Sequence, residues 1–256
     1  MKKEKIFVLI TGASKGLGRC IAVKWAEFCS TGSKMILTAR SETGLKETEK
    51  MVHSINPGIQ VVKFITDHGK PVKGEYESLY DKEVQKPNEK YDSGIFFHNV
   101  GVVEPQGDKI TDYSDITEMA DYFRLNLFSV MILNSVFFPV KEYLSSPLTI
   151  VNVSSLASVL PIPSWGYYCM GKVSRQMYFQ VLAKEEEDVR VLNYSPGAME
   201  TSAIDRIRDS SKTQEHIKAF WKNGLLDPNT SVEKMALILE KNEYESGVQI
   251  DYFDEI

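Results

Sequence analysis

Cysteine is scarce in this 256-residue chain, and long uninterrupted apolar runs are absent. The three cysteines, Cys20, Cys29 and Cys169, are an odd set without a C-x-x-C pair, which suits a reducing compartment. No stretch approaches the roughly 20 apolar residues needed to span a bilayer, and the short apolar run at 6–10 cannot form a secretion signal. We therefore expect a cytoplasmic protein without a membrane anchor.

Basic residues are also in deficit. The chain has 30 Lys and Arg against 35 Asp and Glu, a formal net charge of −5, which gives no overall attraction for nucleic acid or an acidic membrane. Its four histidines are scattered without paired-ligand spacing, so we expect no metal site. The length suits one domain that buries a large core without disulfides.

Short β-branched runs alternate with helical stretches along the chain. Several of these runs are continuously apolar, which is typical of strands buried on both faces of a parallel sheet. The alternation predicts a single α/β domain of the Rossmann type: a doubly wound, seven-stranded, mostly parallel sheet with helices on both faces. The expected strands are 6–10, 34–39, 59–65, 93–98, 148–153, 189–194 and 248–251, and the expected helices are 18–29, 42–54, 72–85, 115–138, 166–184 and 231–241.

A polar segment at 201–225 interrupts this alternation. It begins just beyond the end of the sixth expected strand, at the sheet edge where ligands bind in such folds. The segment is compatible with a substrate lid and equally with a static surface excursion.

A glycine-rich turn follows the first expected strand directly. It reads Thr11-Gly-Ala-Ser-Lys-Gly-Leu-Gly18, so Gly12, Gly16 and Gly18 form a G-x-x-x-G-x-G pattern between a strand and a helix. Glycine permits positive φ and a close approach of the backbone to a ligand, and the free N–H groups at the start of a helix attract a pyrophosphate. This position predicts a dinucleotide site.

The end of the second expected strand indicates which dinucleotide is bound. NAD sites usually place Asp or Glu there for the ribose 2′-hydroxyl, whereas this chain has Arg40 followed by Ser41. Arg40 can pair with a 2′-phosphate through two hydrogen bonds, and Lys15 can approach the same group. The two cations favour NADPH over NADH; the alternative is a pair of solvated surface charges.

Tyr168 and Lys172 lie four residues apart on an expected helix, which puts them on one face. An ammonium close to a phenol stabilises the phenolate, so we expect Lys172 to lower the pKa of Tyr168. Such a tyrosine can exchange a proton with a carbonyl oxygen near neutral pH. The preceding strand delivers Ser154 or Ser155 to the same sheet edge, where a hydroxyl can polarise that carbonyl.

Together these motifs resemble the short-chain dehydrogenase/reductase family, and the family's Ser–Tyr spacing selects Ser155 as the catalytic serine. The resemblance implies that Asn126 holds a water that connects Lys172 to solvent, and that Thr201 reaches the nicotinamide. His98 stands where the family usually has asparagine, which puts in doubt the hydrogen bond of that side chain. The cofactor-binding residues implied are Gly12, Ser14, Lys15, Gly16, Leu17, Gly18, Arg40, Ser41, Asp67, Asn99, Lys172, Met199 and Thr201.

Longer segments are similar to one branch of this family, the sepiapterin reductases, whose members use NADPH to reduce side-chain carbonyls of pterins in tetrahydrobiopterin biosynthesis. The resemblance implies 6-pyruvoyl-tetrahydropterin or sepiapterin as substrate, Asp251 as its anchor, and a homodimer. Ser155, Leu156, Tyr168 and Gly197 would also contact the substrate. The segments are 152–156, 165–172, 179–183, 189–197 and 246–254.

Two other functions compete with this one. A broad carbonyl or diketone reductase of the same family needs the same catalytic residues and a less selective substrate pocket. A non-catalytic NADP-sensing protein needs only the dinucleotide site, and has no use for Ser155, Tyr168 and Lys172 together. A fold alone does not decide among them.

Overall fold

Seven parallel strands form one central sheet in this computed structural model, which describes residues 3–85, 89–209 and 224–255. The strand order is β3-β2-β1-β4-β5-β6-β7, and every neighbouring pair is parallel, which confirms the expected Rossmann-type single domain. The strands are β1 (Ile6–Thr11), β2 (Lys34–Ala39), β3 (Gln60–Ile65), β4 (Ser93–His98), β5 (Leu148–Val153), β6 (Val189–Ser195) and β7 (Gln249–Asp251).

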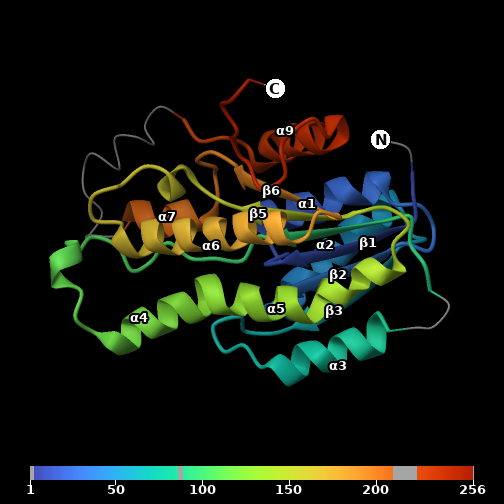
Figure 1. Cartoon of the computed structure of the whole chain (residues 1–256), viewed down its shortest axis with the longest axis horizontal. Coiled ribbons are helices and arrows are strands. Elements are labelled where there is room, and N and C mark those ends of the chain that lie inside the picture. Colours follow the sequence, from blue (N-terminus) through green and yellow to red (C-terminus); the bar gives the residue numbers. More distant parts are fainter. Residues whose placement is uncertain (1–2, 86–88, 210–223, 256) are drawn as a thin grey trace.

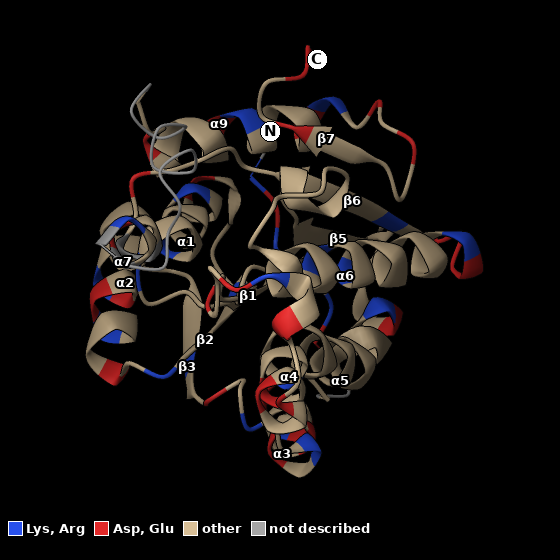
Figure 2. Cartoon of the chain, turned by 90° about the vertical axis from the view of Figure 1, so that its left-hand side faces the viewer, with Lys and Arg blue, Asp and Glu red and all other residues tan. Residues whose placement is uncertain are grey.

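Helices cover both faces of the sheet (Figures 1 and 2). One apolar core lies between the sheet and α1 (Gly16–Phe28), α2 (Glu42–Ile55) and α9 (Pro228–Lys241). A second core lies on the opposite face, under α3 (Lys73–Glu83), α5 (Ser129–Phe137) and α6 (Gly166–Glu185). Because the central strands are buried on both faces, their side chains are apolar at nearly every position, as the sequence predicts.

Helix α9 begins at Pro228, three residues earlier than expected. The Asp227 carboxylate accepts a hydrogen bond from the backbone N–H of Asn229 at 2.8 Å and caps the first turn. Proline at the first helical position has no N–H to leave unpaired, so it starts the helix without cost. The capping residue Asp227 and Pro228 can both be read in the sequence, but the predicted helix of 231–241 begins after them.

One long helical run, Ile116–Tyr143, lies beside α6 on the same face of the sheet. It joins α4 (Ile116–Phe123), a π-helical turn (Arg124–Phe128), α5 and a 3₁₀ segment (Phe138–Tyr143). Among the described residues it alone is long and apolar enough to cross a membrane, a weak signal that core helices share. Leu133 and Phe137 lie in the core and Asn134 bonds inside the protein, which is the packing of a core helix.

The strands point their C-terminal ends at one edge of the sheet, where the remaining short elements gather. These are the 3₁₀ turns Ile110–Asp112 and Leu156–Ser158, and α7 (Ser202–Asp209). Helix α7 occupies the start of the segment expected as a lid, and its Ile207 is buried against Trp165. Most of that segment, 210–223, lies outside the described residues.

Candidate active site

A cavity of about 1560 Å³ runs along the C-terminal edge of the sheet. It exceeds the volume of most sites for one small ligand, so it has room for a dinucleotide and a second molecule. All but two of the predicted site residues line it; Gly18 and Asn126 do not. The predicted residues that line it are Gly12, Ser14, Lys15, Gly16, Leu17, Arg40, Ser41, Asp67, Asn99, Ser155, Leu156, Tyr168, Lys172, Gly197, Met199, Thr201 and Asp251.

The glycine turn forms one wall and adopts backbone that side chains would strain. Gly12 and Gly16 have φ of 71° and 54°, in the left-handed region. Gly18 lies under the turn, where a Cβ atom would meet the carbonyl oxygen of Gly12 at 2.4 Å. Gly18 therefore allows α1 to pack closely against the backbone of the turn. Gly12 and Gly16 instead let the backbone face the cavity at the start of α1.

Asn99 ties the turn after β4 to the glycine turn. Its Nδ2 donates to the carbonyl oxygen of Thr11 at 2.8 Å, and its backbone N–H donates to the Thr11 hydroxyl at 2.9 Å. These bonds hold two walls of the cavity together, β1 on one side and β4 on the other. Residue Asn99 thus has a structural role in addition to its place in the cavity lining.

Two exposed cations stand at the end of the cavity next to β2. Lys15 and Arg40 both line the cavity, and neither forms an ion pair within the described parts of the chain. An anion at this end would meet both charges without displacing a carboxylate. Asp67 lies nearby, where its Oδ1 accepts from the backbone N–H of Gly69 at 3.0 Å.

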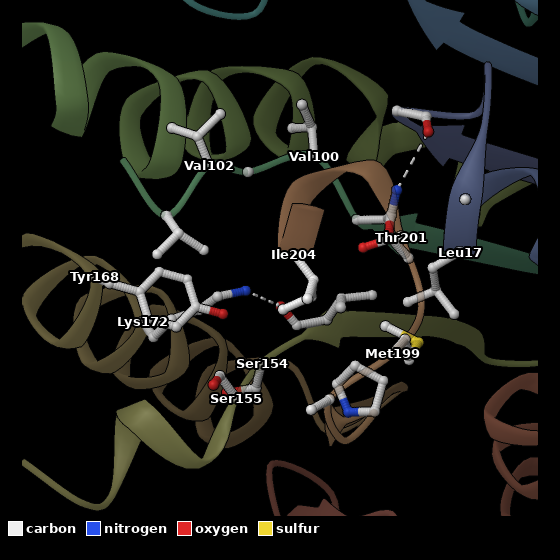
Figure 3. Close-up of a pocket in the computed structure, with 18 of the residues that line it drawn as sticks. Leu17, Val100, Val102, Ser154, Ser155, Tyr168, Lys172, Met199, Thr201 and Ile204 are labelled. Atoms are coloured by element: carbon white, nitrogen blue, oxygen red, sulfur yellow. Dashed lines mark hydrogen bonds between the residues drawn. The ribbon is translucent and has the colours of Figure 1, made fainter. Parts of the chain in front are cut away.

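Tyr168 and Lys172 project into the opposite end of the cavity from α6 (Figure 3). The Lys172 amine lies 5.5 Å from the centre of the Tyr168 ring and donates to the carbonyl oxygen of Val153 at 2.7 Å. That carbonyl ends β5, so the helix pair is anchored to the strand that precedes Ser155. The i, i+4 spacing thus puts the two side chains on one face, as predicted.

The two serines after β5 are distinguished by their partners. The Ser154 hydroxyl is buried and lies within hydrogen-bond distance of Gln176 Oε1 and the Ser158 hydroxyl, both at 3.1 Å. The Ser155 hydroxyl accepts from the backbone N–H of Ala157 at 3.2 Å and acts to lower the pKa of Tyr168. Ser155, the serine that the family spacing selects, is therefore the one that influences the tyrosine.

The expected direction of the Tyr168 pKa is wrong. Burial raises the pKa of Tyr168, and the hydrogen bond with Ser155 and the charge of Arg175 only oppose this rise. Burial, reinforced by Arg175, holds the pKa of Lys172 well below its usual range. The prediction counted the attraction between a phenolate and an ammonium, and omitted the loss of solvent that both groups undergo.

Asn126 sits in the π-helical turn and is buried outside the cavity lining. Its Oδ1 accepts from the backbone N–H of Val102 at 2.9 Å, and its Nδ2 donates to the carbonyl oxygen of Tyr122 at 3.1 Å. The side chain therefore supports a loop that lines the cavity. Its expected role in holding a water stays a prediction.

Asp251 is the last residue of β7 and lines the cavity near Gly197. Its carboxylate accepts hydrogen bonds from the Ser195 hydroxyl and, at 3.0 Å, from the backbone N–H of Phe253. A carboxylate has about four acceptor positions, so it can still accept from a ligand. Asp251 is the only acidic residue in β7, and it lies at the C-terminal end of that strand.

Sequence reasoning missed two features of the site. Arg175 lies one turn after Lys172 on α6 and is 1% exposed; its i, i+3 and i, i+7 spacing from the pair was an available signal. The second feature is an apolar wall around Tyr168, made by segments that are far apart in sequence. It includes Val102, Val103, Leu160, Ile162, Trp165, Ile204 and Ile207.

Comparisons with known sequences cover most of the chain. A profile of the family described as short chain dehydrogenase matches residues 6–212. Sepiapterin reductase of Meriones unguiculatus is 34% identical over 253 residues, with 96% of this chain and 95% of that protein covered. Benzil reductase, the (S)-benzoin-forming enzyme of Bacillus subtilis, is 27% identical, with 91% and 93% covered.

The fold is also similar to solved structures. The KRED1-Pglu enzyme superposes with a TM-score of 0.78 at 26% identity, and the match covers 95% of this chain and 99% of that one. The sepiapterin reductase match and the structural match each cover at least 95% of this chain.

Proposed function

Because this chain belongs to the short-chain dehydrogenase family of oxidoreductases, we propose that it is an NADPH-dependent reductase of side-chain carbonyls on pterins, as in tetrahydrobiopterin biosynthesis. One observation carries the proposal: the glycine turn, Arg40, the Ser155–Tyr168–Lys172 group and Asp251 line a single cavity. The similarity to sepiapterin reductase supports 6-pyruvoyl-tetrahydropterin or sepiapterin as the substrate.

The residues at the glycine turn fit a phosphorylated dinucleotide. Gly12 and Gly16 hold the turn in a left-handed conformation beside the start of α1, where free N–H groups favour a pyrophosphate. Lys15 and Arg40 would hold the 2′-phosphate, since each is exposed and free of ion pairs among the described residues. Ser14, Leu17, Ser41, Asp67, Asn99, Met199 and Thr201 would complete the binding surface.

The catalytic residues would act on the carbonyl oxygen. NADPH, when bound, supplies the hydride that reduces the carbonyl carbon. Tyr168 donates its proton to the oxygen and Ser155 donates a hydrogen bond to it, so the C=O group becomes CH–OH. Lys172 holds its amine beside the phenol through the Val153 carbonyl. Charge on the oxygen grows in the transition state, and these donors stabilise it there.

Asp251 would select the pterin. The 2-amino group and a ring N–H of a pterin form an edge with two donors, which one carboxylate can accept. Its hydrogen bonds with Ser195 and Phe253 fix the position of the carboxylate in the cavity lining. Leu156 and Gly197 would contact the bound substrate from the same region.

A broad carbonyl or diketone reductase is the second candidate. The apolar wall of Val102, Leu160, Ile162 and Trp165 beside Tyr168 suits an apolar diketone, and the benzil reductase similarity favours it. Such an enzyme would not depend on Asp251.

An assay of NADPH oxidation with sepiapterin and with a simple diketone separates the candidates. We expect kcat/KM for sepiapterin to exceed that for the diketone by at least about 10-fold. Asp251→Asn should raise the KM for sepiapterin by about 10-fold, because a charge-assisted hydrogen bond contributes about 1.5–3 kcal/mol, and leave the diketone KM unchanged.

Asp254→Asn is the matched control, because Asp254 bonds the backbone N–H of Asp251 and does not line the cavity. Equal effects of Asp251→Asn on both substrates would favour the diketone reductase. Absence of turnover with every carbonyl would contradict both candidates.

We also propose that the protein is a cytoplasmic homodimer. Its three cysteines are free thiols, which suits a reducing compartment. Val173, Met177 and Val181 form an exposed apolar stripe along α6, with 45%, 56% and 46% of each residue exposed. Such a stripe suits a subunit interface. Sedimentation of the purified chain at a single monomer mass would contradict the dimer.

A further inference from the structure

Arg175 is a buried cation one helical turn behind Lys172. Its Nη1 donates to the carbonyl oxygen of Val100 at 2.7 Å, and its Nη2 donates to that of His98 at 2.6 Å. Its Nε donates to Asn152 Oδ1 at 3.1 Å. One guanidinium thereby joins α6 to the end of β4, to the loop that follows it, and to β5.

All three partners of Arg175 are neutral oxygen atoms. Within the described residues no carboxylate pairs with the guanidinium, although the residue is 1% exposed. Burial of a cation without a counter-charge costs several kcal/mol. A neutral amide could donate to some of the same oxygens at lower cost, so hydrogen bonding alone does not account for arginine here.

The guanidinium lies on a row of polar side chains that crosses the sheet. His98, Asn152, Asn193 and Gln249 occupy matching register positions on β4, β5, β6 and β7. Asn152 Nδ2 donates to Asn193 Oδ1 at 2.9 Å, and Gln249 Nε2 donates to the carbonyl oxygen of Ser155 at 3.4 Å. Hydrogen bonds therefore connect Arg175 through Asn152 to Asn193, and Gln249, at the next register position, bonds the backbone that carries Ser155.

The charge of Arg175 acts on both members of the Tyr168–Lys172 pair. It opposes the rise that burial causes in the pKa of Tyr168, and it adds to the fall that burial causes in the pKa of Lys172. Burial lowers the pKa of Arg175 itself to about 10, so the guanidinium stays charged at neutral pH. The other titratable groups around this cluster are Tyr122 on α4, His98 on β4, Cys169 on α6 and Glu104 in the loop after β4.

We propose that Arg175 is a positioning residue for this reduction: it fixes the backbone behind Tyr168 and Lys172 and holds a permanent positive charge beside that pair. The inference rests on the proposed carbonyl reduction and extends it to a residue outside the cavity lining. The charge makes proton release from the pair easier, which brings a buried phenol closer to the pH at which it can serve as an acid.

Two substitutions separate the charge from the hydrogen bonds. Arg175→Met removes both, and Arg175→Lys keeps the charge but cannot reproduce the three-way bonding. A third variant, Asn152→Asp, keeps the guanidinium and cancels its charge, which covers the case in which Arg175→Met does not fold. Lys34→Met is the control, because Lys34 is a fully buried cation on β2 that does not line the cavity.

We expect Arg175→Met and Asn152→Asp to move the profile of kcat against pH to higher pH by about one pH unit, because loss of a nearby positive charge raises both apparent pKa values of a coupled pair. Turnover at pH 7 should fall by up to about 10-fold, because a weaker acid donates its proton less readily. Arg175→Lys should keep the wild-type pH profile, and Lys34→Met should lower stability without moving the profile.

A role for the hydrogen bonds alone would give the opposite pattern. Arg175→Lys and Arg175→Met would then lose activity equally, both with the wild-type pH profile, and that result would overturn the proposal. Titration of Tyr168 by ¹³Cζ-tyrosine NMR, with its signal assigned through Tyr168→Phe, needs no substrate. An unchanged Tyr168 pKa in Asn152→Asp would overturn the proposal even if no carbonyl substrate were turned over.

Discussion

The amine of Lys172 lies 5.5 Å from the centre of the Tyr168 ring and is bonded to the carbonyl oxygen that ends β5. The same strand leads directly to Ser155, so the end of β5 contacts Lys172 and carries the serine. A change that moves the end of β5 would therefore displace Lys172 and Ser155 together.

Tyr168→Phe should remove most of the turnover and leave NADPH binding intact, because it deletes only the proton donor. We expect kcat to fall by at least about 100-fold, the usual contribution of a positioned acid. Fluorescence titration with NADPH and the oxidation assay measure the two properties. Tyr167→Phe is the control: its ring stacks on Tyr113 at 4.2 Å and does not line the cavity. Wild-type kcat in Tyr168→Phe would contradict the assignment.

Arg40→Ala should weaken NADPH binding without affecting NADH, since only the 2′-phosphate distinguishes the two dinucleotides. Loss of a charged hydrogen bond predicts an increase of at least about 10-fold in the KM for NADPH. The effect should shrink at high salt because Arg40 is exposed. Lys46→Ala, on α2 and paired with Glu42, is the control. Parallel changes with NADPH and NADH would count against a phosphate contact.

Gly18→Ala should lower the free energy of unfolding by about 1–3 kcal/mol, because its Cβ would lie 2.4 Å from the carbonyl oxygen of Gly12. The same displacement should disrupt the turn and weaken dinucleotide binding. Gly74→Ala, at an open position on α3, should leave stability unchanged or raise it by up to about 1 kcal/mol. Urea unfolding compares the two. Equal stability of both variants would show that the turn yields to the added methyl group.

Two buried histidines should make the protein less stable in mild acid. Burial lowers the pKa of His68 to about 4 and that of His98 to about 3. The unfolded chain therefore binds more protons below about pH 6.5, and the stability present above that pH is lost as the pH falls toward the folded values. Each histidine should contribute a loss of about 2 kcal/mol between pH 7 and pH 5.

Urea unfolding at several pH values measures this loss. His98→Asn should remove about half of it, because an amide does not titrate and can still donate to Asn134, the partner of His98 at 3.2 Å. A free energy of unfolding that stays constant between pH 7 and pH 5 would show that these histidines accept protons in the folded protein.

The strand positions, the glycine turn and the Tyr168–Lys172 pair were predictable because they depend on short-range patterns. Apolar runs mark the strands, and the glycine spacing after β1 marks the turn. Asp251, Asn126, Asp67 and Thr201 are different, since only the family resemblance indicated them. The structure places Asp251 in the cavity and Asn126 outside its lining. Residues 210–223 of the expected lid lie beyond the described part of the chain.

The sequence by itself determined which residues share a helix face or follow a strand, because those relations depend only on covalent spacing. It thus brought Tyr168 and Lys172 together and placed Gly12 and Gly16 at a strand–helix turn. Only the tertiary structure decided the direction in which the pKa of each member of that pair shifts. Burial raises the pKa of Tyr168, and Arg175 opposes it. Both effects depend on how segments distant in sequence exclude water, and no local pattern records that.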